Sequence, residues 1–236
     1  MEFAFSKEDS KCGPPIAIED YEIRNLLKLA NLSKKDVFMD LGSGFGMVVL
    51  SALEKTKVGK SEGVEYDIKR FLQCIEFMRD EYSPNKLKRV EFWRAFYQDF
   101  DFSRATVVYN GIYDFGTDEE MEMYEKIHEK KKKPLKIIKR DLPLFPYRPI
   151  KAIRAKKGSW FFLMMTPLKK YKLKNKDEWA KNVFGKKSTM DDVFTSYYQV
   201  LENRFKEDGM SVNNAKKEAK QGLQNFKKLV KKRFPE

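Results

Sequence analysis

A short glycine-rich segment constrains this chain more than any other feature. The run Asp40-Leu41-Gly42-Ser43-Gly44-Phe45-Gly46 closes an apolar stretch typical of a buried strand, and it precedes a stretch that is apolar on most sides, as a packed helix is. Glycines at a strand-to-helix turn let the backbone approach a ligand closely, and the helix N-terminus offers free N–H groups. The segment therefore predicts a ligand-binding turn in an α/β fold.

The spacing of the glycines and the acid before them narrow the kind of ligand. The dinucleotide-binding pattern G-x-G-x-x-G would require glycine where Met47 stands. The carboxylate of Asp40, two residues before the first glycine, would repel a pyrophosphate. It suits a ligand that carries an ammonium and a sulfonium beside a carboxylate.

Apolar spacing along the chain predicts alternating strands and helices before residue 167. We expect helices over 20–30, 47–53, 67–82 and 118–130. We expect strands over 37–41, 62–65, 90–95, 105–109, 135–138, 150–155 and 159–165, the last two forming an antiparallel hairpin about 156–158. This order predicts a mostly parallel α/β sheet, in which ligands bind beyond the carboxyl ends of the strands.

Composition excludes several classes of protein. The 236 residues are 42% hydrophobic, enough for one sizeable core without disulfides or metal. Cys12 and Cys74 stand far apart, and no secretory leader precedes them, so a cytoplasmic location is expected. No apolar run approaches the roughly 20 residues that a membrane span needs, so no span is expected. His128 is the only histidine, which excludes a histidine triad or a multi-histidine metal site.

The glycine segment resembles the first motif, D-x-G-x-G-x-G, of class I S-adenosylmethionine-dependent methyltransferases. The resemblance implies a Rossmann-like seven-strand sheet and S-adenosyl-L-methionine as cofactor. Glu65, which ends the second strand, matches the acid that accepts hydrogen bonds from the ribose hydroxyls, and Tyr66 would lie beside the adenine. Asp99 matches the residue that receives the adenine amino group, with Phe100 alongside. The cofactor-binding residues implied are Asp40, Gly42, Ser43, Gly44, Gly46, Glu65, Tyr66, Asp99, Phe100 and Asn110.

The run from Asn110 to Gly116 carries a second resemblance. Adenine and glutamine methyltransferases have N-P-P-Y here, but Gly111 and Ile112 depart from the two prolines. The non-SET lysine methyltransferases of the disruptor-of-telomeric-silencing type, with an N-N-F element followed by F-G, are more similar. The small archaeal protein lysine methyltransferases also resemble the chain in length and strand order over residues 14–166. The resemblance implies a protein lysine N-methyltransferase with Asn110 and Tyr113 as catalytic residues.

Each of these residues also has a structural interpretation. An aromatic cluster after a strand, here Tyr109 and Tyr113, packs in a core about as often as it lines a channel for an amine. The four acids Asp118, Glu119, Glu120 and Glu122 could attract a basic substrate. They also suit the first turn of a helix, which is the interpretation we favour.

The positive charge lies entirely in the last third of the chain. Residues 1–150 hold 26 basic and 26 acidic side chains, whereas residues 151–236 hold 22 and 9, which accounts for the net charge of +13. We therefore divide the chain into a cofactor-binding domain, residues 1–167, and a basic helical extension, residues 168–236. Two helices are expected in the extension, one capped by Ser188 or Thr189 and one by Ser211. The apolar stripe of the second is expected to pack on the catalytic body.

Three functions fit the sequence. The first is methylation of an accessible lysine on a protein substrate, and the second is methylation of RNA or DNA, favoured by the basic charge. The third is a non-catalytic nucleic-acid-binding protein on the same fold. In each case the basic helices offer a possible contact with nucleic acid.

Overall fold

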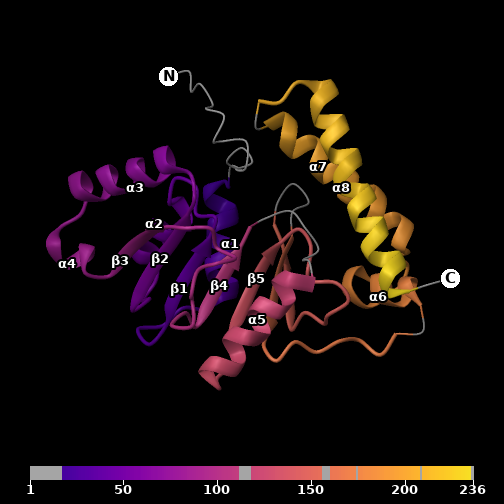
Figure 1. Cartoon of the computed structure of the whole chain (residues 1–236), viewed down its shortest axis with the longest axis horizontal. Helices are drawn as coiled ribbons and strands as arrows, with labels where there is room; N and C mark the ends of the chain where they lie inside the picture. Colours follow the sequence, from indigo (N-terminus) through magenta and orange to yellow (C-terminus); the bar gives the residue numbers. More distant parts are fainter. Residues whose placement is uncertain (1–17, 112–117, 156–159, 174, 208, 235–236) are drawn as a thin grey trace.

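A seven-stranded sheet forms the centre of the first two thirds of the chain (Figure 1). The structure is a computed structural model that describes residues 18–111, 118–155, 160–173, 175–207 and 209–234. The strands are β1 (Val37–Leu41), β2 (Lys60–Glu65), β3 (Val90–Arg94), β4 (Val107–Asn110), β5 (Lys136–Arg140), β6 (Lys151–Arg154) and β7 (Trp160–Met165). Their order in the sheet is β3-β2-β1-β4-β5-β7-β6. The five strands β1 to β5 pair in parallel, and β7 is antiparallel to both β5 and β6, which confirms the predicted sheet with its antiparallel hairpin.

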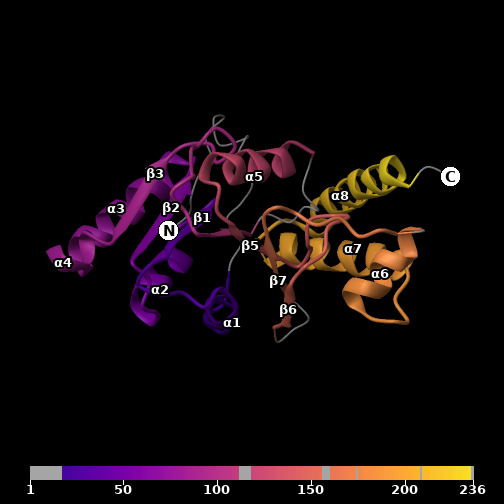
Figure 2. The same cartoon turned by 90° about the horizontal axis from the view of Figure 1, so that it is seen from below.

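Helices cover both faces of this sheet (Figure 2). They are α1 (Asp20–Ala30), α2 (Met47–Lys55), α3 (Ile68–Glu81), the single turn α4 (Pro84–Leu87) and α5 (Asp118–Lys131). Side chains of α1 and α2 pack with one face of β1 and β4, and α2 and α3 pack with β3. Helix α5 packs on the opposite face. The carboxyl ends of the parallel strands are thus left as the edge where a ligand can approach.

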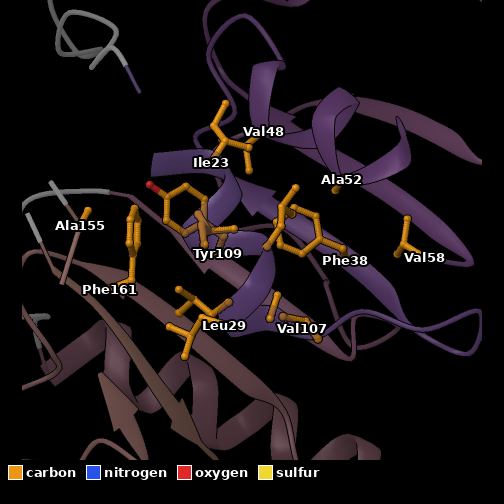
Figure 3. Close-up of a cluster of buried hydrophobic side chains, with 14 residues drawn as sticks. Ile23, Leu29, Phe38, Val48, Ala52, Val58, Val107, Tyr109, Ala155 and Phe161 are labelled. Carbon is orange, nitrogen blue, oxygen red and sulfur yellow. The ribbon is translucent and has the colours of Figure 1, made fainter. Parts of the chain in front are cut away.

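The alternation of side chains along each strand decides which residues share a face. Phe38 and Tyr109 point toward α1 and α2, next to Ile23 and Val48 (Figure 3). Their strand neighbours point toward α5, and Met39 packs there. The same alternation of side chains continues to the carboxyl ends of the strands, where the residues become polar. The polar side chains therefore form two separate clusters, one on each face of the sheet.

The basic extension folds as three helices. They are α6 (Lys176–Phe184), α7 (Met190–Glu207) and α8 (Val212–Arg233). Only the last two were predicted, because α6 is short and its buried pair Trp179 and Ala180 gives little periodic signal. Its start is set by Asn175, whose side chain accepts a hydrogen bond from the N–H of Glu178.

The predicted caps of these two helices are confirmed. Ser211 Oγ accepts a hydrogen bond from the N–H of Asn214 at the start of α8. Thr189, rather than Ser188, caps α7, because Thr189 Oγ1 accepts from the N–H of Asp192. The Asp192 carboxylate accepts from the N–H of Thr189 in return. These reciprocal bonds satisfy backbone donors that the first turn of a helix leaves without partners.

The apolar stripe of α8 packs differently from the expectation. It packs mainly on α7, and the two helices form an antiparallel hairpin at one end of the molecule (Figure 1). Contact with the sheet domain comes through Phe145, in the connection after β5, whose ring meets those of Phe226 and Phe234. Phe145 also packs edge-on against Trp179 of α6. Phe184 of α6 also meets the rings of Trp160 and Phe162 on β7. The extension therefore has its own core and aromatic contacts with the sheet domain, and the division at residue 167 stays a prediction.

None of the helices in the described ranges is both long and apolar enough to cross a membrane.

Candidate functional site: the glycine turn and its neighbours

The glycine turn lies between β1 and α2 in a conformation that requires glycine. Gly42, Gly44 and Gly46 have φ angles of +79°, +55° and +76°, in the left-handed region that other residues rarely adopt. The N–H groups of Gly42 and Ser43 donate to the carbonyl of Val64 on β2, at 2.8 and 2.9 Å. The turn is therefore held by the neighbouring strand.

The three glycines differ in what surrounds them. A Cβ added to Gly42 or Gly44 would meet nothing within 4 Å, whereas one added to Gly46 would lie 2.5 Å from the ring of Phe92. The Ser43 side chain is buried below the turn, where its Oγ would lie 2.7 Å from a Cβ on Gly63. The first two glycines thus border open space at the turn, and the third allows the turn to pack on β3.

Two buried carboxylates lie beside the turn. Asp40 is 3% exposed, and burial, together with the negative charge of Glu65, raises its pKa to about 8. Glu65 accepts from the N–H of Gly44 at 2.7 Å and from that of Asp67 at 2.8 Å. Burial raises the pKa of Glu65 as well, although these bonds and Arg70, 3.8 Å away, oppose the shift. Two like charges out of water favour a ligand that brings positive charge.

An aromatic pair stands at the ends of β2 and β3, where the adenine was predicted to bind. Tyr66 stacks on Phe96 with 3.6 Å between ring centroids. Phe100 was predicted to lie here, but it packs against Trp93, with 5.6 Å between centroids. The predicted adenine contact Asp99 is exposed. Phe96 was overlooked because several aromatic residues follow β3, and spacing alone does not show which one turns toward Tyr66.

A buried polar network holds Asn110 at the carboxyl end of β4. Asn110 is fully buried, and its Nδ2 donates to Glu120 Oε1 at 2.7 Å and to the Tyr124 hydroxyl at 3.2 Å. Lys139 Nζ lies 3.3 Å from the same Glu120 oxygen. Glu120 lies in the first turn of α5, as predicted, but its side chain turns inward and binds Asn110, which the helix-end interpretation did not include. Tyr113 falls outside the described residues.

A second polar cluster lies on the face covered by α1. Arg140, at the end of β5, donates to both carboxylate oxygens of Glu22, at 2.7 and 2.6 Å, and both side chains are 1% exposed. Burial raises the pKa of the neighbouring Tyr109, opposed by the positive charge of Arg140. This cluster had no sequence signal, since its two ionic partners are 118 positions apart.

Cys74 and His128, which the sequence did not favour as functional, are not part of the polar clusters described above. Cys74 Sγ lies 3.4 Å from the Gly44 carbonyl, and burial raises the pKa of its thiol to about 12, so it stays protonated and unreactive. His128 is near the end of α5, its Nδ1 3.1 Å from the Lys133 carbonyl. The described ranges contain no group of three metal-ligating side chains.

Comparison with known proteins agrees with this geometry. The family model described as "Histone methylation protein DOT1" matches residues 20–139, just over half of the chain. The chain belongs to this family. The match begins at α1 and ends in β5, so it includes the glycine turn, Glu65, Asn110 and Glu120.

Individual relatives of this DOT1-family chain are distant. A protein-lysine N-methyltransferase of Saccharolobus islandicus (strain REY15A) is 26% identical over 95 residues, which are 40% of this chain and 57% of that relative. An RNA methyltransferase of Salinibacter ruber, solved with S-adenosyl-L-homocysteine, matches 68% of this chain and 98% of its own at 18% identity and a TM-score of 0.54. A SAM-dependent methyltransferase of Aquifex aeolicus matches 69% and 99%, at 14% identity and a TM-score of 0.50.

The DOT1-family chain therefore has the class I methyltransferase fold, and its family and fold are those of proteins that use S-adenosyl-L-methionine (SAM). Its own residues fit that cofactor. The open space at Gly42 and Gly44 leaves room for a ligand against the backbone, and the paired acids Asp40 and Glu65 suit the ligand's positive charges. The individual contacts assigned to these residues stay predictions.

Proposed function

We propose that this chain is a SAM-dependent methyltransferase that methylates lysine side chains of proteins. The observation that carries the proposal is the position of Asn110 beside the glycine turn. Asn110 and Leu41 are register partners on β4 and β1, so the asparagine lies directly next to the strand that leads into Gly42. The family description and the name of the Saccharolobus relative support a protein acceptor.

SAM, when bound, supplies a methyl group on a sulfonium, which passes to a neutral nucleophile by in-line displacement. A lysine must therefore lose its proton before it reacts. Burial disfavours a charged amine and lowers its pKa, so a narrow apolar channel achieves this without a strong base. We assign the predicted Tyr113 to the wall of that channel. Tyr109 packs in the core beneath α1 and α2, on the other face of the sheet from the Asn110 side chain, so it is not part of the channel.

Glu120 orients the asparagine. Because Asn110 Nδ2 donates to Glu120 and to Tyr124, the amide Oδ1 lies on the side away from Glu120. A fixed carbonyl oxygen can accept a hydrogen bond from the lysine amine and aim its lone pair. We infer that Glu120 is a positioning residue and Asn110 the catalytic one.

Substitutions at these two positions test the roles. Asn110→Ala should lower kcat strongly and leave the Kd for SAM within a fewfold of the parent. Glu120→Gln should lower kcat less, because a glutamine keeps one acceptor oxygen. Asn182→Ala, on the exposed face of α6, is the matched control. Normal turnover in Asn110→Ala would refute the assignment.

Methylation of nucleic acid is the second candidate, favoured by the basic extension. Radiolabelled methyl transfer into mixed protein and RNA fractions separates the two: label released by protease supports a protein acceptor, and label released by nuclease refutes it. The third candidate, a binding protein without turnover, predicts no transfer in either fraction. Calorimetry with SAM tests the cofactor separately, and an absence of binding would refute all enzymatic proposals. The cytoplasmic location stays a prediction.

A further inference from the structure

The last turn of α8 is tied to the first turn of α5 by two basic side chains. Lys232 and Arg233 both pair with the carboxylate of Asp118, which precedes them in the chain by 114 and 115 positions. Arg233 is the more enclosed of the two, with a side chain that is 20% exposed, against 69% for Lys232. The hydrogen bond from Lys232 and the charges of both cations hold the pKa of Asp118 below its usual value, so the link is ionic at neutral pH.

The same end of α8 reaches the connection that follows β5. The ring of Phe234 meets that of Phe145, with 5.8 Å between centroids. Tyr147, in the same connection, is buried in the apolar cluster that contains Met121 and Tyr124 of α5. The end of α8 therefore contacts α5 directly and also contacts the connection that packs beside it.

The first turn of α5 also carries the partner of Asn110. Asp118, Glu119 and Glu120 all belong to this turn. Glu120 Oε1 accepts from Asn110 Nδ2 at 2.7 Å and from the Tyr124 hydroxyl at 3.0 Å. The first N–H groups of a helix have no partner within the helix, so a first turn opens more easily than the middle. A link to Asp118 restrains the turn from which Glu120 reaches Asn110.

We propose that Arg233 and Lys232 are positioning residues for methyl transfer. They act through Asp118, which holds the first turn of α5 and with it the bond between Glu120 and Asn110. The proposal rests on the proposed function, in which Asn110 is the catalytic residue. It gives the extension a part in the reaction without contact with SAM or the acceptor. The family match ends at residue 139, so it does not include the α8 side of this link.

The exposure of the link separates positioning from a structural role. The side chain of Asp118 is 42% exposed, and ion pairs this open to water contribute little to the free energy of unfolding. The body of α5 is held on the sheet by its buried residues Met121, Tyr124 and Ile127. Loss of the link should therefore leave the fold intact and change mainly the orientation of the first turn.

A cycle of variants tests the link on the full chain. The link variant carries Lys232→Gln and Arg233→Gln, the second variant carries Asp118→Asn, and a third combines all three changes. If the cations act through Asp118, the combined variant should lose no more activity than either alone, because the interaction is already absent. The matched control carries Lys220→Gln and Lys228→Gln, at exposed positions of the same helix and with the same change in net charge.

Rates of methyl transfer from radiolabelled SAM into one protein fraction give the first readout. The link variant should lose about three- to tenfold in maximal rate, as expected for residues that act through a chain of contacts. Its KM for SAM should stay within about twofold of the parent, and its melting temperature within about 3 °C. Arg233→Lys, which keeps the charge, should keep most of the rate. An equal loss in the control, or losses that add in the combined variant, would overturn the proposal.

Solvent exchange of the Asn110 side-chain amide, followed by NMR, tests the link without turnover. These hydrogens are buried and bonded to Glu120 and Tyr124, so they should exchange slowly in the parent and the control, and faster in the link variant. Their signals are assigned by their absence from Asn110→Ala. An unchanged exchange rate contradicts the proposal, and so does faster exchange with undiminished transfer. A parent that methylates no protein refutes the proposed function, and the exchange rates then decide alone whether the link holds Asn110.

Discussion

The buried carboxyl group of Asp40 predicts how SAM affinity depends on pH. Its pKa is raised to about 8, so at pH 7 about one molecule in eleven carries the carboxylate. A ligand with an ammonium and a sulfonium favours the ionised form. Binding below pH 8 must therefore release a proton, and this lowers the apparent affinity at pH 7 by about elevenfold, or about 1.4 kcal/mol.

Calorimetry at pH 6.0, 6.5, 7.0 and 7.5 measures this effect. We expect the Kd for SAM to fall by nearly tenfold per pH unit over this range. Buffers with different ionisation enthalpies should show close to one proton released. Asp40→Asn should bind more weakly and lose the pH dependence, whereas Asp80→Asn, an exposed position on α3, should keep it.

The stability of the free protein should change with pH in the opposite direction. A folded-state pKa above the unfolded value of about 3.9 means that the folded protein holds the extra proton between pH 4 and 8. The contribution of Asp40 to stability is complete below pH 4 and is lost as the pH rises through 8.

Affinity for SAM that is independent of pH, or that falls from pH 6 to 7.5, would refute this account of Asp40.

Three further predictions concern the fold and the turn. Gly46→Ala should lower the free energy of unfolding by about 2–4 kcal/mol, because its Cβ would overlap a core ring at positive φ, whereas Gly44→Ala should cost about 1–2 kcal/mol and mainly weaken SAM binding. Equal effects of the two on stability in urea unfolding would contradict this distinction. Glu22→Gln leaves the buried Arg140 charge poorly compensated and should cost about 3–5 kcal/mol in the same assay, so a loss below 1 kcal/mol would be inconsistent with a buried pair. Phe145→Ala should cost about 3–5 kcal/mol and speed hydrogen exchange in α6 and α8 more than in β1, and uniform protection would argue against its anchoring role.

Local patterns predicted the parts of this fold that depend on short stretches of sequence. The glycine turn, the strand ends at Leu41 and Glu65, and the cap of α8 at Ser211 all follow from spacing within a few residues. The mostly parallel sheet and its antiparallel hairpin followed from the alternation of strands and helices. Strand boundaries moved by one or two positions, as at β2, which begins at Lys60.

The side-chain partners in the site could not be predicted in the same way. Glu120 shares the first turn of α5 with Asp118, yet one binds Asn110 in the interior and the other pairs with α8. Which acid turns inward depends on how α5 packs on β4, a long-range property. The pair of Glu22 and Arg140 depends likewise on the contact of α1 with β5.

The position of Phe145 has a consequence for how this protein can be divided or recombined. Its ring belongs to the connection after β5, but its neighbours Trp179, Phe226 and Phe234 belong to the helices of the extension. A fragment that stops at residue 167 would leave this ring without those neighbours. The helices can therefore be exchanged between relatives as a working module only if the segment around Phe145 travels with them.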